Sequence, residues 1–109
     1  MIRFTQNLTV IVGRLTKDPE VNETSKGFAG NFSLATDESF LDAQKNRVEK
    51  TEYHRVIIFN SDAVYMRDHA KKGEYVIVQG KKQTRQWEKD GVKQYTVEII
   101  ADVITPIKR

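Results

Sequence analysis

Residues 51–80, TEYHRVIIFNSDAVYMRDHAKKGEYVIVQG, decide the fold of this chain. Their first part, TEYHRVIIF, is rich in β-branched and aromatic residues and is the strongest strand signal in the sequence. The next part has the marks of a helix, with Asn60 or Ser61 as N-cap, Asp62 in the first turn and Gly73 as the C′ residue. The last part, EYVIVQG, begins another strand. The stretch therefore predicts a strand, the only helix of the chain, and a strand in succession.

Further strands are expected on both sides of this stretch. Alternating apolar residues predict strands over residues 8–15 and 28–36, and over 93–107 after the strand at 74–87. Asp90-Gly91 between the last two is typical of a type I′ hairpin turn. Residues 16–27 are expected to be a polar turn, and residues 37–50 a long polar loop of the kind that often carries function. The order predicts an all-β OB-fold, a five-stranded, partly open Greek-key barrel with one helix between strands 3 and 4.

Length and composition narrow the classes of protein that fit. The 109 residues are expected to form one domain over residues 1–109. The longest apolar runs are far too short to cross a bilayer, and no secretory signal pattern opens the chain, so a cytoplasmic location is expected. The absence of cysteine excludes disulfides and thiolate metal sites.

Positive charge is concentrated in one part of the chain. The net charge is +3, and residues 71–93 carry 7 Lys or Arg against 3 Asp or Glu, while residues 1–70 carry 9 against 10. Basic residues gathered on one element indicate a polyanionic partner, although charge alone fits a solvated face equally well.

The alternation of each strand separates a core side from an outer side. Along residues 51–59, His54, Val56 and Ile58 point one way, while the other set mixes the aromatics Tyr53 and Phe59 with a cation. By the same count the only tryptophan, Trp87, shares a side with Lys81 and Arg85. Aromatic rings beside cations suit a single nucleic-acid strand, because bases stack on rings while cations lie near phosphates. The helix has little excess charge, which disfavours reading of a duplex groove.

No pattern supports catalysis or metal binding. His54 and His69 lack partners for a metal site or a catalytic triad, and there is no phosphate-binding glycine loop. His54 is expected to be a buried or interface residue that forms hydrogen bonds. No catalytic residues, metal or cofactor are therefore expected, and the chain is not expected to be an enzyme.

Four segments carry a resemblance to a known family: VGRLTKDPE (12–20), FSLATDESF (32–40), KTEYHRVIIF (50–59) and KKGEYVIVQGKKQTRQWEKDGVKQYTVEIIAD (71–102). In this order, and over nearly the whole chain, the sequence resembles the bacterial single-stranded DNA-binding proteins. The resemblance implies sequence-independent coating of single-stranded DNA in replication, recombination or repair, in the cytoplasm and associated with the nucleoid.

The resemblance also implies roles for individual residues. The stacking aromatics of the family fall on Phe40, Tyr53, Phe59 and Trp87, and the family often has tryptophan at the first two positions. Its cations that contact the DNA backbone correspond here to Arg3, Arg14, Arg55, Lys72, Lys81, Lys82 and Arg85. A homotetramer is implied, with interface candidates Leu8, Val10 and His54. The family usually continues into a Gly/Gln/Pro-rich linker and an acidic tip, whereas this sequence ends in ITPIKR, so recruitment of proteins through such a tail is not expected.

Three alternatives remain open from the residues. One is a replication-restart accessory protein of the same fold that acts mainly through protein interactions. The second is an RNA binder of the cold-shock type, although such domains are shorter and carry clustered aromatic motifs that this chain lacks. The third is a nuclease on an OB barrel, for which no convincing carboxylate cluster exists. The role of Tyr95, as a stacking ring or as a brace for Trp87, also remains open.

Overall fold

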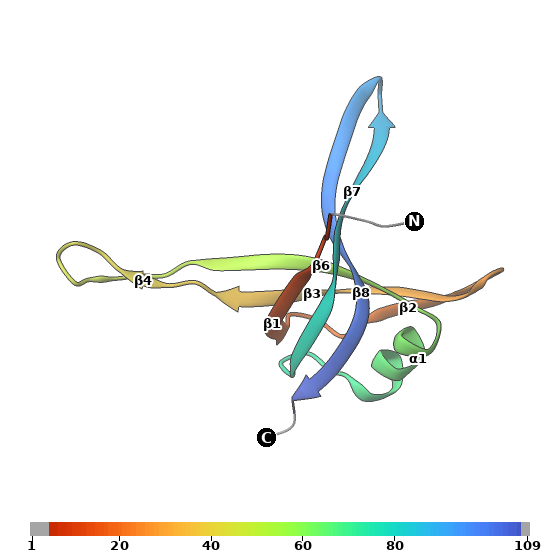
Figure 1. Cartoon of the computed structure of the whole chain (residues 1–109), viewed down its shortest axis with the longest axis horizontal. Coiled ribbons are helices and arrows are strands. Elements are labelled where there is room, and N and C mark those ends of the chain that lie inside the picture. The colour runs from red at the N-terminus through yellow and green to blue at the C-terminus, as the bar shows by residue number, and fades with distance from the viewer. Residues whose placement is uncertain (1–4, 108–109) are drawn as a thin grey trace.

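Within residues 5–107 the chain folds into a small barrel with one helix, and β-hairpins protrude from it (Figure 1). The structure is a computed structural model that describes residues 5–107. The barrel strands are β1 (Thr9–Leu15), β3 (Gly27–Asp37), β6 (Thr51–Phe59), β7 (Tyr75–Lys89) and β8 (Val92–Ile107). The helix α1 (Asn60–His69) lies between β6 and β7 in the chain, as predicted.

The pairing of the strands confirms the predicted OB-fold. Around the barrel the order is β1-β7-β8-β6-β3, and β3 pairs back onto β1 through Arg14↔Ala35 and Leu15↔Leu34. All these pairs are antiparallel except β6 with β8, which run parallel. In terms of the five barrel strands, the third lies beside the fifth and the fourth returns to the first, which is the Greek-key order.

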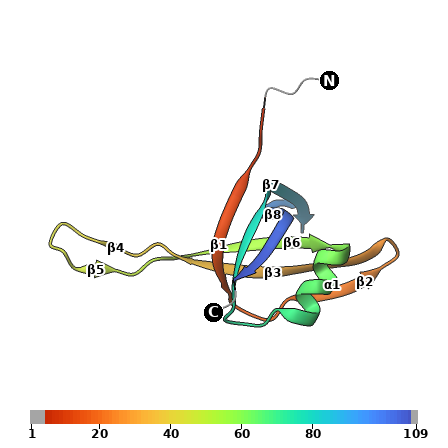
Figure 2. The same ribbon diagram turned by 60° about the horizontal axis from the view of Figure 1, so that its bottom comes forward.

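The core follows the alternation of the strands. On β6, Val56 and Ile58 are fully buried while Tyr53 and Phe59 are exposed, which confirms the predicted division of that strand. Val76 and Val78 contribute the inner side of β7. Helix α1 packs Met66, with its neighbour Ala63, against this core at one end of the barrel (Figure 2).

One predicted polar turn contains a strand. Within residues 16–27, β2 (Glu20–Thr24) pairs with β3 from Glu20↔Asn31 to Thr24↔Gly27. The strand lies outside the barrel and is mostly exposed, with only Val21 half-buried among polar residues. It therefore lacks the apolar alternation by which the other strands are recognised.

The ends of α1 differ from the prediction. The N-cap is Phe59, in an extended conformation and without a side-chain capping bond, because β6 runs directly into the helix. The Asn60 side chain instead lies against Gly27 of the neighbouring hairpin. At the other end the helix stops at Ala70, which is buried in the core, and Gly73 lies in the following turn, where its amide donates to the Leu15 carbonyl at 2.8 Å.

Two long hairpins extend beyond the barrel as arms, in addition to the hairpin of β2 and β3 (Figure 1). The first is the end of β7 and the start of β8, closed by Asp90 and Gly91 with φ of 52° and 78°. These two positive values confirm the predicted type I′ turn. The second continues β3 and β6 into the predicted loop, where β4 (Phe40–Leu41) pairs with β5 (Arg47–Val48).

A β-bulge divides the barrel part of β8 from its arm part. Gln79 pairs with Val103 but Gly80 pairs with Ala101, so Asp102 is an extra residue in β8. A side chain on Gly80 would collide with the carbonyl of Ile100, which explains a glycine at this close approach. The bulge reverses which residues of β8 face outward, and β7 keeps its own alternation throughout.

Candidate nucleic-acid interface

The outer side of β6 carries exposed rings on both sides of a cation. Tyr53 is 67% exposed and Phe59 is 49% exposed, with Arg55 between them on the same side of the strand. Their neighbours across the β3 ladder are small, since Ala35 faces Tyr53 and Ala29 faces Phe59. Small neighbours leave the faces of these rings accessible.

The β7–β8 arm presents Trp87 together with a cation. The Arg85 guanidinium lies over the Trp87 ring, 4.8 Å from its centroid, which confirms that the two side chains share a side of the strand. Trp87 is 39% exposed, so one part of the indole remains open to solvent. The register pairs Tyr95 with Gln86 rather than with Trp87, so Tyr95 lies on the opposite side of the arm and does not brace the indole.

A buried carboxylate joins these two surfaces. Arg55 Nε donates to Glu98 Oε2 at 2.7 Å, and Arg85 Nε donates to Glu98 Oε1 at 3.2 Å. Two residues further along β8, Ile100 is paired with Lys81 of β7 and with Ile57 of β6. The outer side of β6 and the Trp87 side of the arm are therefore one continuous surface, hereafter the aromatic face: Tyr53, Arg55, Ile57, Phe59, Lys81, Arg85, Trp87, Glu98 and Ile100.

Two further predicted cations lie beside Tyr53. Arg14, Tyr53 and Lys72 line one cavity at the edge of the aromatic face. Arg14 reaches this position because β1 and β6 are both paired with β3, through Arg14↔Ala35 and Ala35↔Tyr53. The Lys72 amide donates to Asp18 Oδ1 at 2.7 Å, which fixes the turn after α1.

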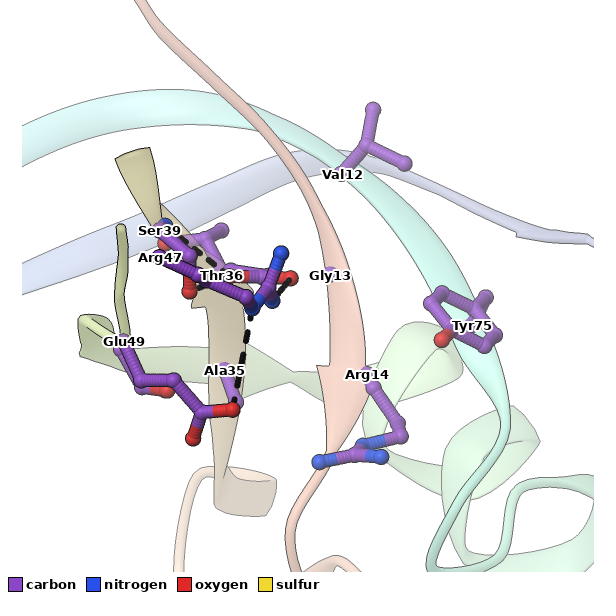
Figure 3. A pocket seen from close by; sticks show the side chains of 11 residues that line it. Val12, Gly13, Arg14, Ala35, Thr36, Ser39, Arg47, Glu49 and Tyr75 are labelled. Atoms are coloured by element: carbon purple, nitrogen blue, oxygen red, sulfur yellow. Dashed lines mark hydrogen bonds and ion pairs between the residues drawn. The ribbon is translucent and has the colours of Figure 1, made fainter. Parts of the chain in front are cut away.

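A second cavity lies between β1 and the base of the β4–β5 arm (Figure 3). Arg47 and Glu49 lie on its arm side, and Arg14 lies on its β1 side. The charge of Arg47 is already balanced, because the guanidinium pairs with Asp37 at 3.4 Å and with Glu49 at 3.7 Å. Arg14 lines this cavity and also the cavity beside Tyr53.

The remaining predicted contact residues are not all brought to the aromatic face. Phe40 lies on the β4–β5 arm and is 52% exposed. Lys82 pairs with the buried Ile99, which places it on the side of β7 opposite Trp87. Arg3 lies outside the described residues.

The predicted interface residues fall into two groups. Leu8, just before β1, and Val10, in the outward set of β1, are both more than half exposed, whereas the intervening set contains the buried Ile11. His54 belongs instead to the inward set of β6, is half-buried, and forms a 2.9 Å hydrogen bond with Thr36 Oγ1. The prediction of a hydrogen-bonded His54 is confirmed, but it does not share the outward side of β1.

Glu98 is not among the site residues predicted from the sequence. The feature that could have indicated Glu98 is its position as a lone carboxylate inside the apolar run TVEII, on a strand expected to cross the barrel. Within residues 5–107, no three His, Asp or Glu side chains are grouped so as to hold a metal ion. No helix in the same range is long and apolar enough to span a membrane.

Comparison of the chain with known proteins identifies its family. Residues 6–107 match the model of the single-strand binding protein family. The chain belongs to this family. Single-strand binding proteins bind single-stranded DNA and are not enzymes, which agrees with the expectation from the sequence.

Individual relatives agree with this assignment. Over 97 residues the chain is 40% identical to single-stranded DNA-binding protein 1 of Chlorobaculum tepidum, and the match covers 86% of this chain but 60% of that protein. A Plasmodium falciparum SSB, solved in complex with ssDNA, superimposes with a TM-score of 0.87 at 26% identity, covering 99% of this chain and 100% of that one. A deletion mutant of the single-stranded DNA binding protein from Thermus aquaticus gives a TM-score of 0.81 at 33% identity, covering 94% and 51%. The chain thus spans about three fifths of the curated relative's length.

Proposed function

We propose that this protein binds single-stranded DNA without sequence preference and coats exposed strands during replication, recombination or repair. The observation that carries the proposal is the aromatic face, on which exposed rings and cations from β6 and the β7–β8 arm form one surface. The relative solved in complex with ssDNA supports the same assignment, because it covers nearly the whole chain. Such a role belongs in the cytoplasm, with the nucleoid.

The rings are proposed to stack with bases. Trp87, Phe59 and Tyr53 lie on the aromatic face, and Phe40 extends the path onto the second arm. Stacking contributes about 1–3 kcal/mol per base and accepts every base, since each has a π face. Arg85 covers one face of the Trp87 indole, so a base would use the other face.

Cations around the rings are proposed to neutralise the phosphates. Lys81 belongs to the aromatic face, and Arg14 and Lys72 flank Tyr53. Release of counterions from the strand then supplies part of the affinity, so binding weakens as salt rises. Lys82 would contact only a strand that passes around the edge of the arm.

The geometry favours single strands over duplexes. Exposed rings need unstacked bases, which a duplex does not offer. Helix α1, the element that a major groove would admit, is packed against the core through Ala63 and Met66. Its surface also carries Asp62, and Asp68 is paired with Arg67 at 2.9 Å, so the helix offers phosphates no excess positive charge.

Trp87 fluorescence tests the proposal directly, because the chain has one tryptophan. Titration with oligo(dT) is expected to quench the emission strongly, while a duplex of equal length at the same salt leaves it nearly unchanged. Equal quenching by both would refute single-strand preference. Preference for an RNA oligomer of the same sequence would indicate the cold-shock type instead, and weak binding of all oligomers would favour the restart accessory.

The assembly is proposed to be a homotetramer built on β1. Within residues 5–107, β3 pairs with β1 only at Arg14 and Leu15, and no other strand of that range pairs with this edge of β1 along residues 9–13, where a strand from another copy would add. The outer side of β1, β7 and β8 also exposes apolar residues that a second copy would cover. This surface, hereafter the apolar face, comprises the exposed Leu8, Val10, Val12, Val103 and Ile107 and the half-buried Ile77.

A further inference from the structure

Glu98 stands apart from every other polar side chain in the described structure. Among residues 5–107 it is the one buried polar or charged residue, with 7% of its side chain exposed. A buried carboxylate is tolerated only when it is paired and hydrogen-bonded, because leaving water is costly for a charge. Its partners, Arg55 and Arg85, both belong to the aromatic face.

The carboxylate divides its two oxygens between two strands. Oε2 accepts from Arg55 of β6 and Oε1 accepts from Arg85 of β7, while Glu98 itself lies on β8. Each bond uses the Nε–H, one of five N–H donors of a guanidinium. Arg85 is therefore held at one end by Glu98 and lies over Trp87 at 4.8 Å. A chain of contacts runs from the barrel to the stacking ring on the arm.

Two consequences for a bound strand follow from this arrangement. Two guanidiniums beside one carboxylate offer a strand one net positive charge instead of two. Both guanidiniums are also fixed in place before DNA arrives, which lowers the entropy lost when a base stacks on Trp87. Glu98 thus weakens the attraction for phosphates and strengthens the part of the affinity that depends on stacking.

We propose that Glu98 is a positioning residue that sets the balance between base stacking and phosphate contact on the aromatic face. This inference rests on the proposed binding of single-stranded DNA. It predicts that loss of the negative charge makes binding more dependent on salt and weaker where salt screens the phosphates.

The test is a salt titration of oligo(dT) binding to the wild type, Glu98→Gln and Glu88→Gln. Glu88→Gln removes the same charge, but its register with Lys93 places it on the opposite side of the arm from Trp87. In Glu98→Gln each released arginine is expected to steepen the slope of log K against log salt by about 0.7. Near 1 M salt, where screening acts within about 3 Å, binding is expected to be about threefold to tenfold weaker. Glu88→Gln should match the wild type there.

A second readout separates positioning from a general loss of structure. Time-resolved anisotropy of Trp87 in the free protein is expected to show a more mobile indole in Glu98→Gln and an unchanged one in Glu88→Gln. Arg85→Gln replaces an exposed side chain and should reproduce both the mobility and the weakening at high salt. If Glu98→Gln does not fold, the Arg85→Gln variant alone tests whether the contact with Arg85 holds Trp87 in place. In the double variant, Glu98→Gln should add little at high salt to the effect of Arg85→Gln.

The outcomes distinguish the two proposals. If the wild type binds oligo(dT) but Glu98→Gln and Glu88→Gln coincide at every salt concentration, the role of Glu98 is refuted and the proposed function stands. Unchanged Trp87 mobility and high-salt affinity in Arg85→Gln would refute it as well. A wild type that does not bind oligo(dT) refutes the proposed function itself.

Discussion

Trp87 is the residue whose surroundings are hardest to explain without a ligand. It lies on an arm beyond the barrel, with a guanidinium over its ring, and it is absent from the core cluster. A large apolar ring gains little in such a place from the fold alone, since much of its surface stays in water. A stacked base would cover the open part of the indole while the neighbouring cations remain near phosphates.

At this scale the first prediction compares two residues of the arm. Trp87→Ala is expected to weaken oligo(dT) binding by about 1–3 kcal/mol, because one stacked base is lost, and the loss should persist at high salt. Lys89→Ala, two residues further on the same side, should cost less, and its effect should fade as salt rises. Fluorescence anisotropy of a labelled oligomer at low and high salt measures both. A larger loss for Lys89→Ala would contradict stacking on Trp87.

The arm as an element depends on its turn. Asp90 and Gly91 both have positive φ, and a side chain on Gly91 would meet no atom within 4 Å. Gly91→Ala is therefore expected to cost roughly 1–2 kcal/mol through backbone conformation alone. The loss should appear as faster amide exchange in residues 84–96, with the barrel unchanged. Gly73→Ala, at φ 92° in equally open space, is the matched control and should leave the arm protected. Equal protection in both variants would contradict a turn-limited arm.

Elements were predictable from the sequence wherever alternation or turn chemistry was local. β6, the Asp90-Gly91 turn and the inward set of Val56 and Ile58 follow from short-range pattern and are confirmed. β2 could not be predicted because Val21 is its only apolar residue, so the strand carries no apolar period. The N-cap of α1 could not be predicted either, because the Asn60 side chain lies against Gly27, a residue distant in sequence, and does not cap the helix. Such features are decided by tertiary contacts, which no local pattern encodes.

The second arm is tied at its base by Asp37. Its Oδ1 accepts from the Ser39 hydroxyl at 2.6 Å and from the Ser39 amide at 3.0 Å, and the Ser39 hydroxyl oxygen accepts from the Lys50 amide at 3.2 Å. These bonds from Ser39, helped by Arg47, hold the pKa of the Asp37 carboxyl below its ordinary value. A lowered pKa in the folded state means that the stabilisation is complete above the unfolded pKa and is lost as pH falls through the folded one.

This linkage gives a prediction for the arm that carries Phe40. In an NMR titration the Ser39 amide is expected to shift with a midpoint below about 3.9, the ordinary value for Asp. Protection of the Lys50 amide should fall over the same range, while β6 stays protected. Asp37→Asn should abolish the Ser39 transition at every pH, and Asp42→Asn, a change of the same kind nearer the tip of the arm, should preserve it. A midpoint at the ordinary value would contradict the role of Ser39.

At the scale of the whole molecule, the outer side of the sheet carries two surfaces of different chemistry. The aromatic face collects rings and cations, whereas the apolar face on β1, β7 and β8 collects exposed aliphatic residues. The bulge at Asp102 lets β8 contribute to both surfaces, because it turns Val103 outward beside Gln79 while Ile99 stays in the core. The sequence indicated the basic stretch and the rings of the first surface. It did not indicate Glu98 as their link, since that role depends on three strands meeting in space.

The last prediction concerns the assembly built on the apolar face. Val12 is 52% exposed in one copy, so Val12→Asp should leave each barrel folded. In a homotetramer every copy would have to bury the new carboxylate without a partner, which costs several kcal/mol, and the assembly is expected to dissociate. Light scattering should then report four chains for the wild type and one or two for Val12→Asp, with matching circular dichroism. Val97→Asp is the control, because Val97 is equally exposed at 53% but lies on the arm, outside the apolar face. A Val12→Asp protein that keeps the wild-type mass would show that copies assemble through another surface.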